Sequence, residues 1–214
     1  MPCYPAWAKI NLGLKVGAKR SDGYHDILTV MQTVSLSDRV ELTPTLAGIN
    51  LEVVGADLPL DERNLAVQAA KLMKHKGKIV QGANIKLTKM IPLAAGLAGG
   101  SADAAAVLYA LNELWQVNLS LEELLELGTA IGSDVPFALH GGTALAQGRG
   151  EIISPLPPLP DCYFVLACPN VTVSTAWAYQ EIDRMAAASH PVDIPSLVAA
   201  LDRGDMAQIA AALA

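Results

Sequence analysis

The alternation of apolar and polar residues predicts several strands along the chain. In the stretch AKINLGLKV, residues 8–16, apolar side chains at alternate positions are separated by polar or small ones, as in a half-buried strand. The same reasoning predicts further strands over 27–34, 38–43, 49–54, 83–90, 143–147 and 162–168.

A period of 3.6 residues predicts helices between and after these strands. Over residues 101–115, Ala104, Leu108, Leu111 and Trp115 fall on one face. Ser120 and Glu123 have the spacing of a capping box, so a second helix is expected to run to about residue 131. Other helices are predicted over 63–77, 175–188 and 195–214, with a loop and a short helix at 132–142. Strands and helices mix without steady alternation, which indicates the α+β class.

Composition excludes several classes of protein. The 214 residues are 52% hydrophobic and 17% charged, so the chain can form a packed core and is not disordered. No apolar run is long enough to span a membrane, the start lacks the features of a signal peptide, and the net charge of −6 comes without a basic stripe for nucleic acid. Three scattered cysteines predict a reduced, cytoplasmic protein.

The stretch PLAAGLAGGSADAAA, residues 92–106, combines a glycine-rich loop with the start of a predicted helix. Glycines let an anion approach the backbone, and the first N–H groups of a helix attract negative charge. The stretch lacks the lysine of a Walker A loop and the spacing of the dinucleotide fingerprint. It predicts a phosphate site, with tight packing of small residues as the alternative.

This loop resembles the ATP-phosphate loop of the GHMP small-molecule kinases. AKINLGLKVGAKRSDGYHDILTVMQTV, residues 8–34, and GSDVPFALHGGTALAQGRGE, residues 132–151, resemble two other signatures of the branch that phosphorylates a cytidine diphosphate-linked polyol on its 2-hydroxyl, in the non-mevalonate route to isoprenoids. The resemblance implies a two-domain α+β fold with its active site in the interdomain cleft. It implies an ATP-binding catalytic domain over 1–154 and a partial C-terminal domain over 155–214, after the proline-rich stretch SPLPPLPD.

The resemblance also assigns roles to individual residues. Lys9 and Asp134 match the catalytic lysine and base, and Ser101 matches the hydroxyl nearest to Mg²⁺ between the β- and γ-phosphates of ATP. The positions that match ATP-binding residues are Asn64, Leu65, Pro92, Leu93, Ala94, Ala95, Gly96, Leu97, Ala98, Gly99, Gly100, Ser101 and Ala102. The positions that match substrate-binding residues are Asn11, Tyr24, His25, Thr175 and Tyr179.

The same residues have structural interpretations that the sequence leaves open. These are a helix cap for Asp134, Ser101 and Asn64, a surface position for Lys9, a core position for Leu65 and Tyr179, and an ordinary turn for Tyr24 and His25.

Two alternatives to this kinase activity also remain open: a mevalonate- or sugar-type GHMP kinase, and a GHMP-fold protein that binds nucleotide without turnover. The presence of both Lys9 and Asp134 argues against the second. Because residues 195–214 end in an apolar helical run without a cap, and the family continues further, we expect the sequence to be part of a longer chain.

Overall fold

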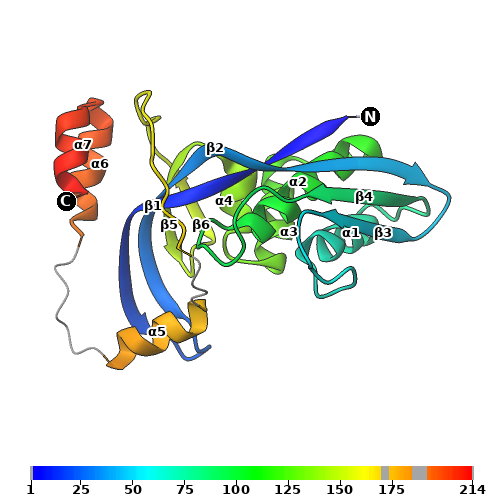
Figure 1. Cartoon of the computed structure of the whole chain (residues 1–214), viewed down its shortest axis with the longest axis horizontal. Helices are drawn as coiled ribbons and strands as arrows, with labels where there is room; N and C mark the ends of the chain where they lie inside the picture. The colour runs from blue at the N-terminus through cyan, green and yellow to red at the C-terminus, as the bar shows by residue number, and fades with distance from the viewer. Residues whose placement is uncertain (1, 170–173, 185–191, 214) are drawn as a thin grey trace. The chain divides into compact units, whose positions relative to one another are not determined.

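The computed structural model describes residues 2–169, 174–184 and 192–213, in which helices and strands are mixed throughout the sequence (Figure 1). The strands are β1 Cys3–Lys19, β2 His25–Thr45, β3 Ile49–Val54, β4 Gly82–Thr88, β5 Thr143–Gly148 and β6 Ile152–Pro155. The helices are α1 Leu65–Lys76, α2 Gly99–Leu114, α3 Leu121–Ile131, α4 Val135–His140, α5 Thr175–Arg184, α6 Ile194–Arg203 and α7 Met206–Ala212. None of the described helices has the length and hydropathy needed to cross a membrane.

The chain divides into two compact units that each draw on three segments. Unit 1 consists of Met1–Lys9, Thr33–Ile91 and Ala98–Gly141. Unit 2 consists of Ile10–Gln32, Pro92–Leu97 and Gly142–Ala214. Both β1 and β2 contribute residues to each unit. The domain limits expected from the sequence, 1–154 and 155–214, stay a prediction.

Unit 1 packs helices against a small sheet. The second half of β2 pairs antiparallel with β4, from Arg39 opposite Thr88 to Thr45 opposite Gly82, and β4 pairs in parallel with β3. Alternation in β4 buries Ile85 and Leu87, as the sequence predicts. These side chains share one core with the buried faces of α1 and α2, so the sheet and the helices hold the end of β4 and the start of α2 rigidly.

Unit 2 contains its own apolar core. The first half of β2 pairs antiparallel with β5, from Ile27 opposite Gly148 to Gln32 opposite Thr143, and β5 pairs with β6. One face of α6 packs on this sheet and on α7, so that Ile194, Leu197 and Leu201 share a core with Leu12 and Val30. This core supports β1 and β2. The turn between these two long strands contains Tyr24, and β2 begins directly after it.

Several predicted elements differ from the structure. The pieces 27–34 and 38–43 form one strand, β2, because its two halves pair with different partners and the residues between them stay extended. Residues 195–214 form two helices separated at Gly204, which adopts a left-handed conformation. The second of these helices does have a cap, because the Asp205 carboxylate accepts hydrogen bonds from the backbone N–H groups of Ala207 and Gln208.

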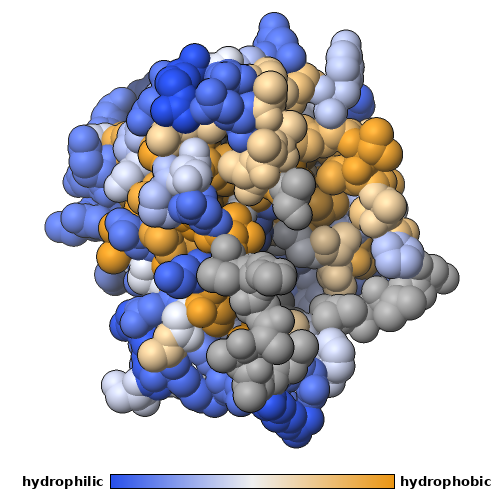
Figure 2. Space-filling model, turned by 90° about the vertical axis from the view of Figure 1, so that its left-hand side faces the viewer, coloured by the Kyte–Doolittle hydropathy of each residue, from blue (hydrophilic) through white to orange (hydrophobic). Residues whose placement is uncertain are grey.

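The predicted strand at 162–168 was wrong, since this segment is not a strand and pairs with none of the strands described. Apart from Cys162, its residues are exposed, and Tyr163 and Val165 are almost fully so. An apolar run predicts a strand only where a neighbouring strand supplies hydrogen bonds, and periodicity carries no information about that neighbour. Other large apolar side chains are exposed as well, and Figure 2 shows apolar surface interspersed with polar groups.

Candidate active site

Lys9 and Asp134, far apart in sequence, form an ion pair in unit 1. The Nζ atom of Lys9 lies 3.9 Å from Oδ2 of Asp134. Lys9 follows the buried Ala6 and Ala8 on β1 and is itself only 7% exposed, so its interpretation as a surface lysine was wrong. A buried ammonium group needs a nearby acceptor or negative charge, and the Asp134 carboxylate supplies one.

Asp134 occupies the N-cap position of α4, but its side chain makes no capping hydrogen bond. The helix start is held instead by the buried residues Val135, Pro136 and Phe137. The Asp134 side chain remains 33% exposed, so one side of the carboxylate can be reached from solvent while the other faces Lys9. A carboxylate in this position can accept a hydrogen bond from a bound hydroxyl group.

The glycine-rich loop has an unusual backbone. Ala94, Gly96 and Ala98 all have positive φ angles, of 53°, 74° and 57°. Helix α2 begins directly after Ala98, at Gly99, and no side chain caps it. Its first N–H groups therefore have neither an intrahelical partner nor a side-chain cap among the described residues, which is the arrangement that attracts a phosphate.

The two glycines at the start of α2 differ in how closely other residues pack against them. A Cβ atom on Gly99 would lie 3.2 Å from the Ile91 side chain, whereas one on Gly100 would meet only Leu65, at 3.8 Å. Close packing therefore explains Gly99, while the backbone of Gly100 is open to approach. Ser101 lies in the first turn of the helix, not at its N-cap as the structural alternative required.

Asn64 and Leu65 open α1 in unit 1. The Asn64 Oδ1 atom accepts a hydrogen bond of 3.0 Å from Ala66 N, and its Nδ2 atom donates one of 3.0 Å to Pro59 O. Leu65 is half-buried and packs against the core. The structural interpretation of these two residues is thus confirmed. Contact with adenine stays a prediction, and it would involve the part of the Leu65 side chain that is not packed against the core.

A buried charged network, which the sequence analysis missed, lies beside the start of α2. It consists of Asp38 on β2, Lys89 after β4 and Asp103 on α2, and each side chain is at most 3% exposed. Burial raises the pKa of Asp103 from its usual 3.8 to about 7, and the Asp38 carboxylate acts in the same direction while Lys89 opposes them. The available signal was an acid, Asp103, inside an otherwise uncharged glycine-alanine stretch.

In unit 2, His25 lies in a polar cluster with α5. Its Nε2 atom is 2.8 Å from Asp183 Oδ1, and its ring stacks on Tyr179 with centroids 5.0 Å apart and planes at 11°. Lys19 donates a hydrogen bond of 3.1 Å to the other oxygen of Asp183. Hydrogen bonds from His25 and then Lys19 lower the pKa of Asp183. Asp183 was missed from the sequence, although it lies one turn after Tyr179.

The remaining predicted substrate residues lie in the same unit. Tyr24 is 54% exposed, and the Arg149 guanidinium lies 5.0 Å from the centre of its ring. Asn11 is exposed on β1. Thr175 begins α5, but its side chain lies outside the described residues. Unit 2 therefore brings His25 and Tyr179 into contact, and Tyr24 directly precedes His25 in the sequence.

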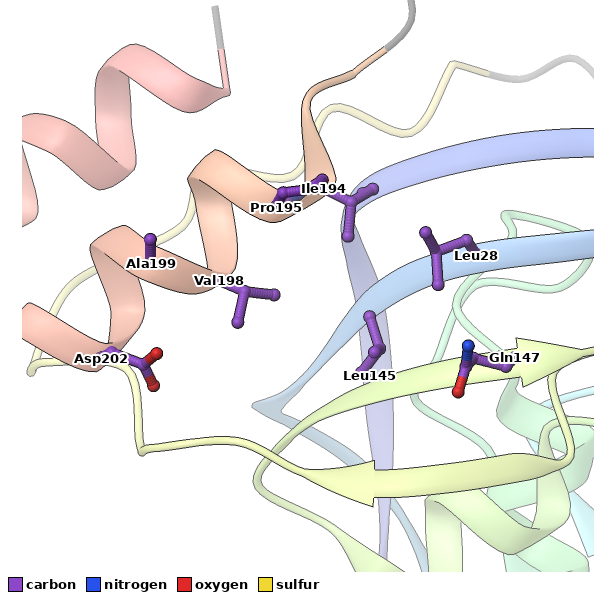
Figure 3. Close-up of a pocket in the computed structure, with 8 residues that line it drawn as sticks. All are labelled: Leu28, Leu145, Gln147, Ile194, Pro195, Val198, Ala199 and Asp202. Carbon is purple, nitrogen blue, oxygen red and sulfur yellow. The ribbon is translucent and has the colours of Figure 1, made fainter.

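A cavity of about 460 Å³ in unit 2 is lined by a different set of residues. These are Leu28, Leu145, Gln147, Ile194, Pro195, Val198, Ala199 and Asp202 (Figure 3). The close-up shows the apolar side chains of β2, β5 and α6 turned toward one another, with Gln147 and Asp202 at the ends. None of the residues that line it is among those predicted for the active site, so the cavity is not part of the candidate active site.

Comparison with known proteins agrees with this geometry. Residues 64–142, which include α1, the glycine-rich loop and Asp134, match the GHMP kinases N terminal domain. The 4-diphosphocytidyl-2-C-methyl-D-erythritol kinase of Geobacillus kaustophilus is 53% identical over 94% of this chain and 70% of its own length, and that of Exiguobacterium sibiricum is 50% identical over 96% and 72%.

Solved structures give the same result. The crystal structure of a 4-(cytidine 5′-diphospho)-2C-methyl-D-erythritol kinase superposes with a TM-score of 0.75 and 35% identity, covering 95% of this chain and 72% of that one. A homoserine kinase from Cytophaga hutchinsonii, at 23% identity and a TM-score of 0.69, shares the fold. The chain has an α+β fold of the GHMP kinase type, and its sequence is about 50% identical to those of its relatives over most of its length. It therefore belongs to the 4-diphosphocytidyl-2-C-methyl-D-erythritol kinase family.

Proposed function

We propose that this protein transfers the γ-phosphoryl group of ATP to the 2-hydroxyl group of 4-diphosphocytidyl-2-C-methyl-D-erythritol. The observation that carries the proposal is the ion pair of the buried Lys9 with the partly exposed Asp134, whose carboxylate is not used to cap α4. A buried lysine beside a partly exposed carboxylate suits a reaction in which a hydroxyl group loses its proton and gains a phosphoryl group.

The proposed step needs little from the protein beyond position and charge. The substrate oxygen forms a bond to the γ-phosphorus as the bond from that atom to the β-γ bridging oxygen breaks, which leaves ADP. Asp134 orients the hydroxyl group and receives its proton, and Lys9 stabilises the negative charge that develops on the oxygen. Since the transition state is loose, orientation by Asp134 contributes even where the carboxylate is a weak base.

The residues Pro92–Ala102 are proposed to hold the phosphates of ATP, with Asn64 and Leu65 on the adenine side. The uncapped start of α2 and the open backbone at Gly100 support this assignment. Among the described residues, no three carboxylate, histidine or cysteine side chains are placed to bind a metal together. Bound Mg²⁺ would neutralise phosphate charge, held mainly by phosphate oxygens with Ser101 as the proposed side-chain ligand.

The substrate's cytidine diphosphate end is proposed to bind Asn11, Tyr24, His25, Thr175 and Tyr179. An imidazole whose Nε2 is engaged by Asp183 retains Nδ1 for the polar edge of cytosine, and the aromatic rings offer stacking faces. Neither nucleic acid nor a membrane is a proposed partner. We also propose a cytoplasmic location, which the unpaired Cys3, Cys162 and Cys168 support.

The proposal is tested by incubating the protein with Mg²⁺, ATP and separate acceptors: the cytidylated methylerythritol, mevalonate and galactose. We expect ADP and a new phosphomonoester with the first acceptor only. Phosphorylation of mevalonate or galactose instead would identify a different GHMP kinase activity. Binding of ATP without ADP formation in any mixture would favour the non-catalytic alternative.

A further inference from the structure

The buried charges of unit 1 connect the two ends of the glycine-rich loop. Lys89 Nζ donates a hydrogen bond of 2.6 Å to Asp103 Oδ2 and a short one to Asp38 Oδ2. The other oxygen of Asp38 accepts hydrogen bonds from the backbone N–H groups of Met90 and Ile91, the latter at 2.8 Å. Asp38 therefore holds residues 89–91, which lead into the loop, through hydrogen bonds. Lys89 links this segment to Asp103, which follows the loop.

The network also sets the distance between the two segments that flank the glycine-rich loop. The loop leaves the sheet at the end of β4 and returns as the first turn of α2, where the side chain of Ile91 lies against Gly99. Lys89 Nζ would itself lie only 3.5 Å from a Cβ atom at Gly99. The network and this contact together determine how far the start of α2 stands from the end of β4, and so the span that the loop must bridge.

Stability alone gives a poor account of the network. Two carboxylates share one lysine, and Asp103 Oδ1 is buried without a hydrogen-bond partner among the described residues. Apolar side chains of similar volume often give equal or greater stability than buried ion pairs, whereas in some proteins buried charged groups specify one arrangement of the segments that carry them. Here the specified segments are those that flank the proposed phosphate site.

We propose that Asp38, Lys89 and Asp103 are positioning residues for the nucleotide: they hold the two ends of the glycine-rich loop at the separation that ATP phosphates require. The inference rests on the proposed function, because it takes the loop as the phosphate site. The three side chains are buried beside the loop, so they act through its backbone and do not contact the nucleotide.

Asp103→Ala is the principal test, with Asp103→Asn as the conservative variant. The alanine variant loses the tie between Lys89 and α2 while leaving the Asp38 contacts in place, and the asparagine variant keeps an oxygen for Lys89. We expect Asp103→Ala to raise KM for ATP about 10-fold or more while kcat changes by less than about 3-fold, and Asp103→Asn to restore most of the affinity.

Leu111→Ala is the matched control for a general loss of stability, because Leu111 is a fully buried core residue of the same helix. It should lower Tm without changing KM for ATP at temperatures well below Tm. Hydrogen exchange without nucleotide gives a second readout, in which Asp103→Ala should expose amides of residues 90–103 selectively and Leu111→Ala should not.

The two readouts separate the inference from the proposed function. Unchanged exchange at 90–103 together with unchanged KM for ATP in Asp103→Ala would overturn the inference, as would a shift in KM equal to that of Leu111→Ala. If the unmodified protein binds no ATP, the proposed function fails. In that case selective exchange in Asp103→Ala would still show that the network holds the loop, and its absence would refute that as well.

Discussion

Two charged clusters of this protein contain similar groups in different surroundings. In unit 1, Lys89 lies between Asp38 and Asp103, and none of the three side chains is more than 3% exposed. In unit 2, Asp183 lies between the buried His25 and Lys19, and the Asp183 and Lys19 side chains are 35% and 54% exposed. In both clusters, side-chain hydrogen bonds join the charged groups, so the kind of contact does not distinguish them.

The difference in burial predicts different consequences. Exposed ion pairs contribute about 0–1 kcal/mol, because water and salt screen them, whereas removing one member of a buried network leaves an uncompensated charge. The buried cluster should therefore control the conformation of the segments around the glycine-rich loop. The exposed cluster can orient His25 and adjust to a ligand without affecting the stability of the fold.

The largest effect is expected from Lys89→Met, which leaves two buried carboxylates without their cation. We expect a loss of about 3–5 kcal/mol in the free energy of unfolding, measured by urea denaturation. The control is Lys71→Met, which removes an exposed ion pair with Glu62 on the surface of the same unit and should cost less than about 1 kcal/mol. Equal losses in the two variants would remove the distinction between the clusters.

The second prediction concerns the pH dependence of stability in the buried network. The pKa of Asp103 is raised from 3.8 to about 7, so between these values the unfolded chain releases a proton that the folded protein keeps. The stabilising effect of this protonation is complete below pH 4 and is lost as the pH rises toward 7. The Tm of Asp103→Asn minus that of the unmodified protein should therefore increase from pH 4 to 7 and level off above it.

This difference in Tm largely cancels the titration of groups outside the network. It includes the response of Asp38 and Lys89, which face Asp103 directly. A difference that stays constant from pH 4 to 8 would show that Asp103 is ionised in the folded protein throughout this range.

A smaller effect, confined to one ligand, is expected from His25→Ala. If the imidazole binds the cytosine edge, its loss leaves a polar group of the substrate unpaired at a cost of about 1–3 kcal/mol. KM for the cytidylated substrate should rise accordingly, and KM for ATP should stay unchanged. Parallel loss of affinity for both ligands would instead indicate that the turn before β2 has changed conformation.

The smallest effect is expected from Asp183→Asn, since the Asp183 and Lys19 side chains are partly exposed and their charges are screened. KM for the cytidylated substrate should increase by no more than about 5-fold, consistent with an exposed pair worth about 0–1 kcal/mol, and the increase should shrink as salt is added. Stability should change little near neutral pH. A loss comparable to that of Lys89→Met would place Asp183 among the residues that determine the fold.

Local patterns predicted much of the fold. The capping box at the start of α3 is present, with Ser120 Oγ accepting from Glu123 N and Glu123 Oε2 accepting from Ser120 N. Such features depend on neighbours in sequence, which periodicity and capping rules describe. The prediction of a strand over 162–168 was wrong because a strand depends on a partner strand that its own residues do not specify.

The candidate site was predicted less completely, and for the same reason. Family resemblance identified Lys9 and Asp134, but the residues alone favoured a surface lysine and a helix cap. The network of Asp38, Lys89 and Asp103 requires three separate segments to converge, and no spacing in the sequence reveals such a convergence. Its charged residues became significant only once their burial was known.

The central claim is that the ion pair of Lys9 and Asp134 carries out phosphoryl transfer. It is tested most directly by the turnover of Asp134→Asn at saturating ATP and acceptor, together with the affinity of this variant for ATP. Asparagine preserves the shape of the side chain while removing its charge and its ability to take a proton. We predict that kcat falls about 100-fold or more and that the Kd for ATP stays within about 2-fold of the unmodified protein. Near-normal turnover with unchanged ATP binding would contradict the account.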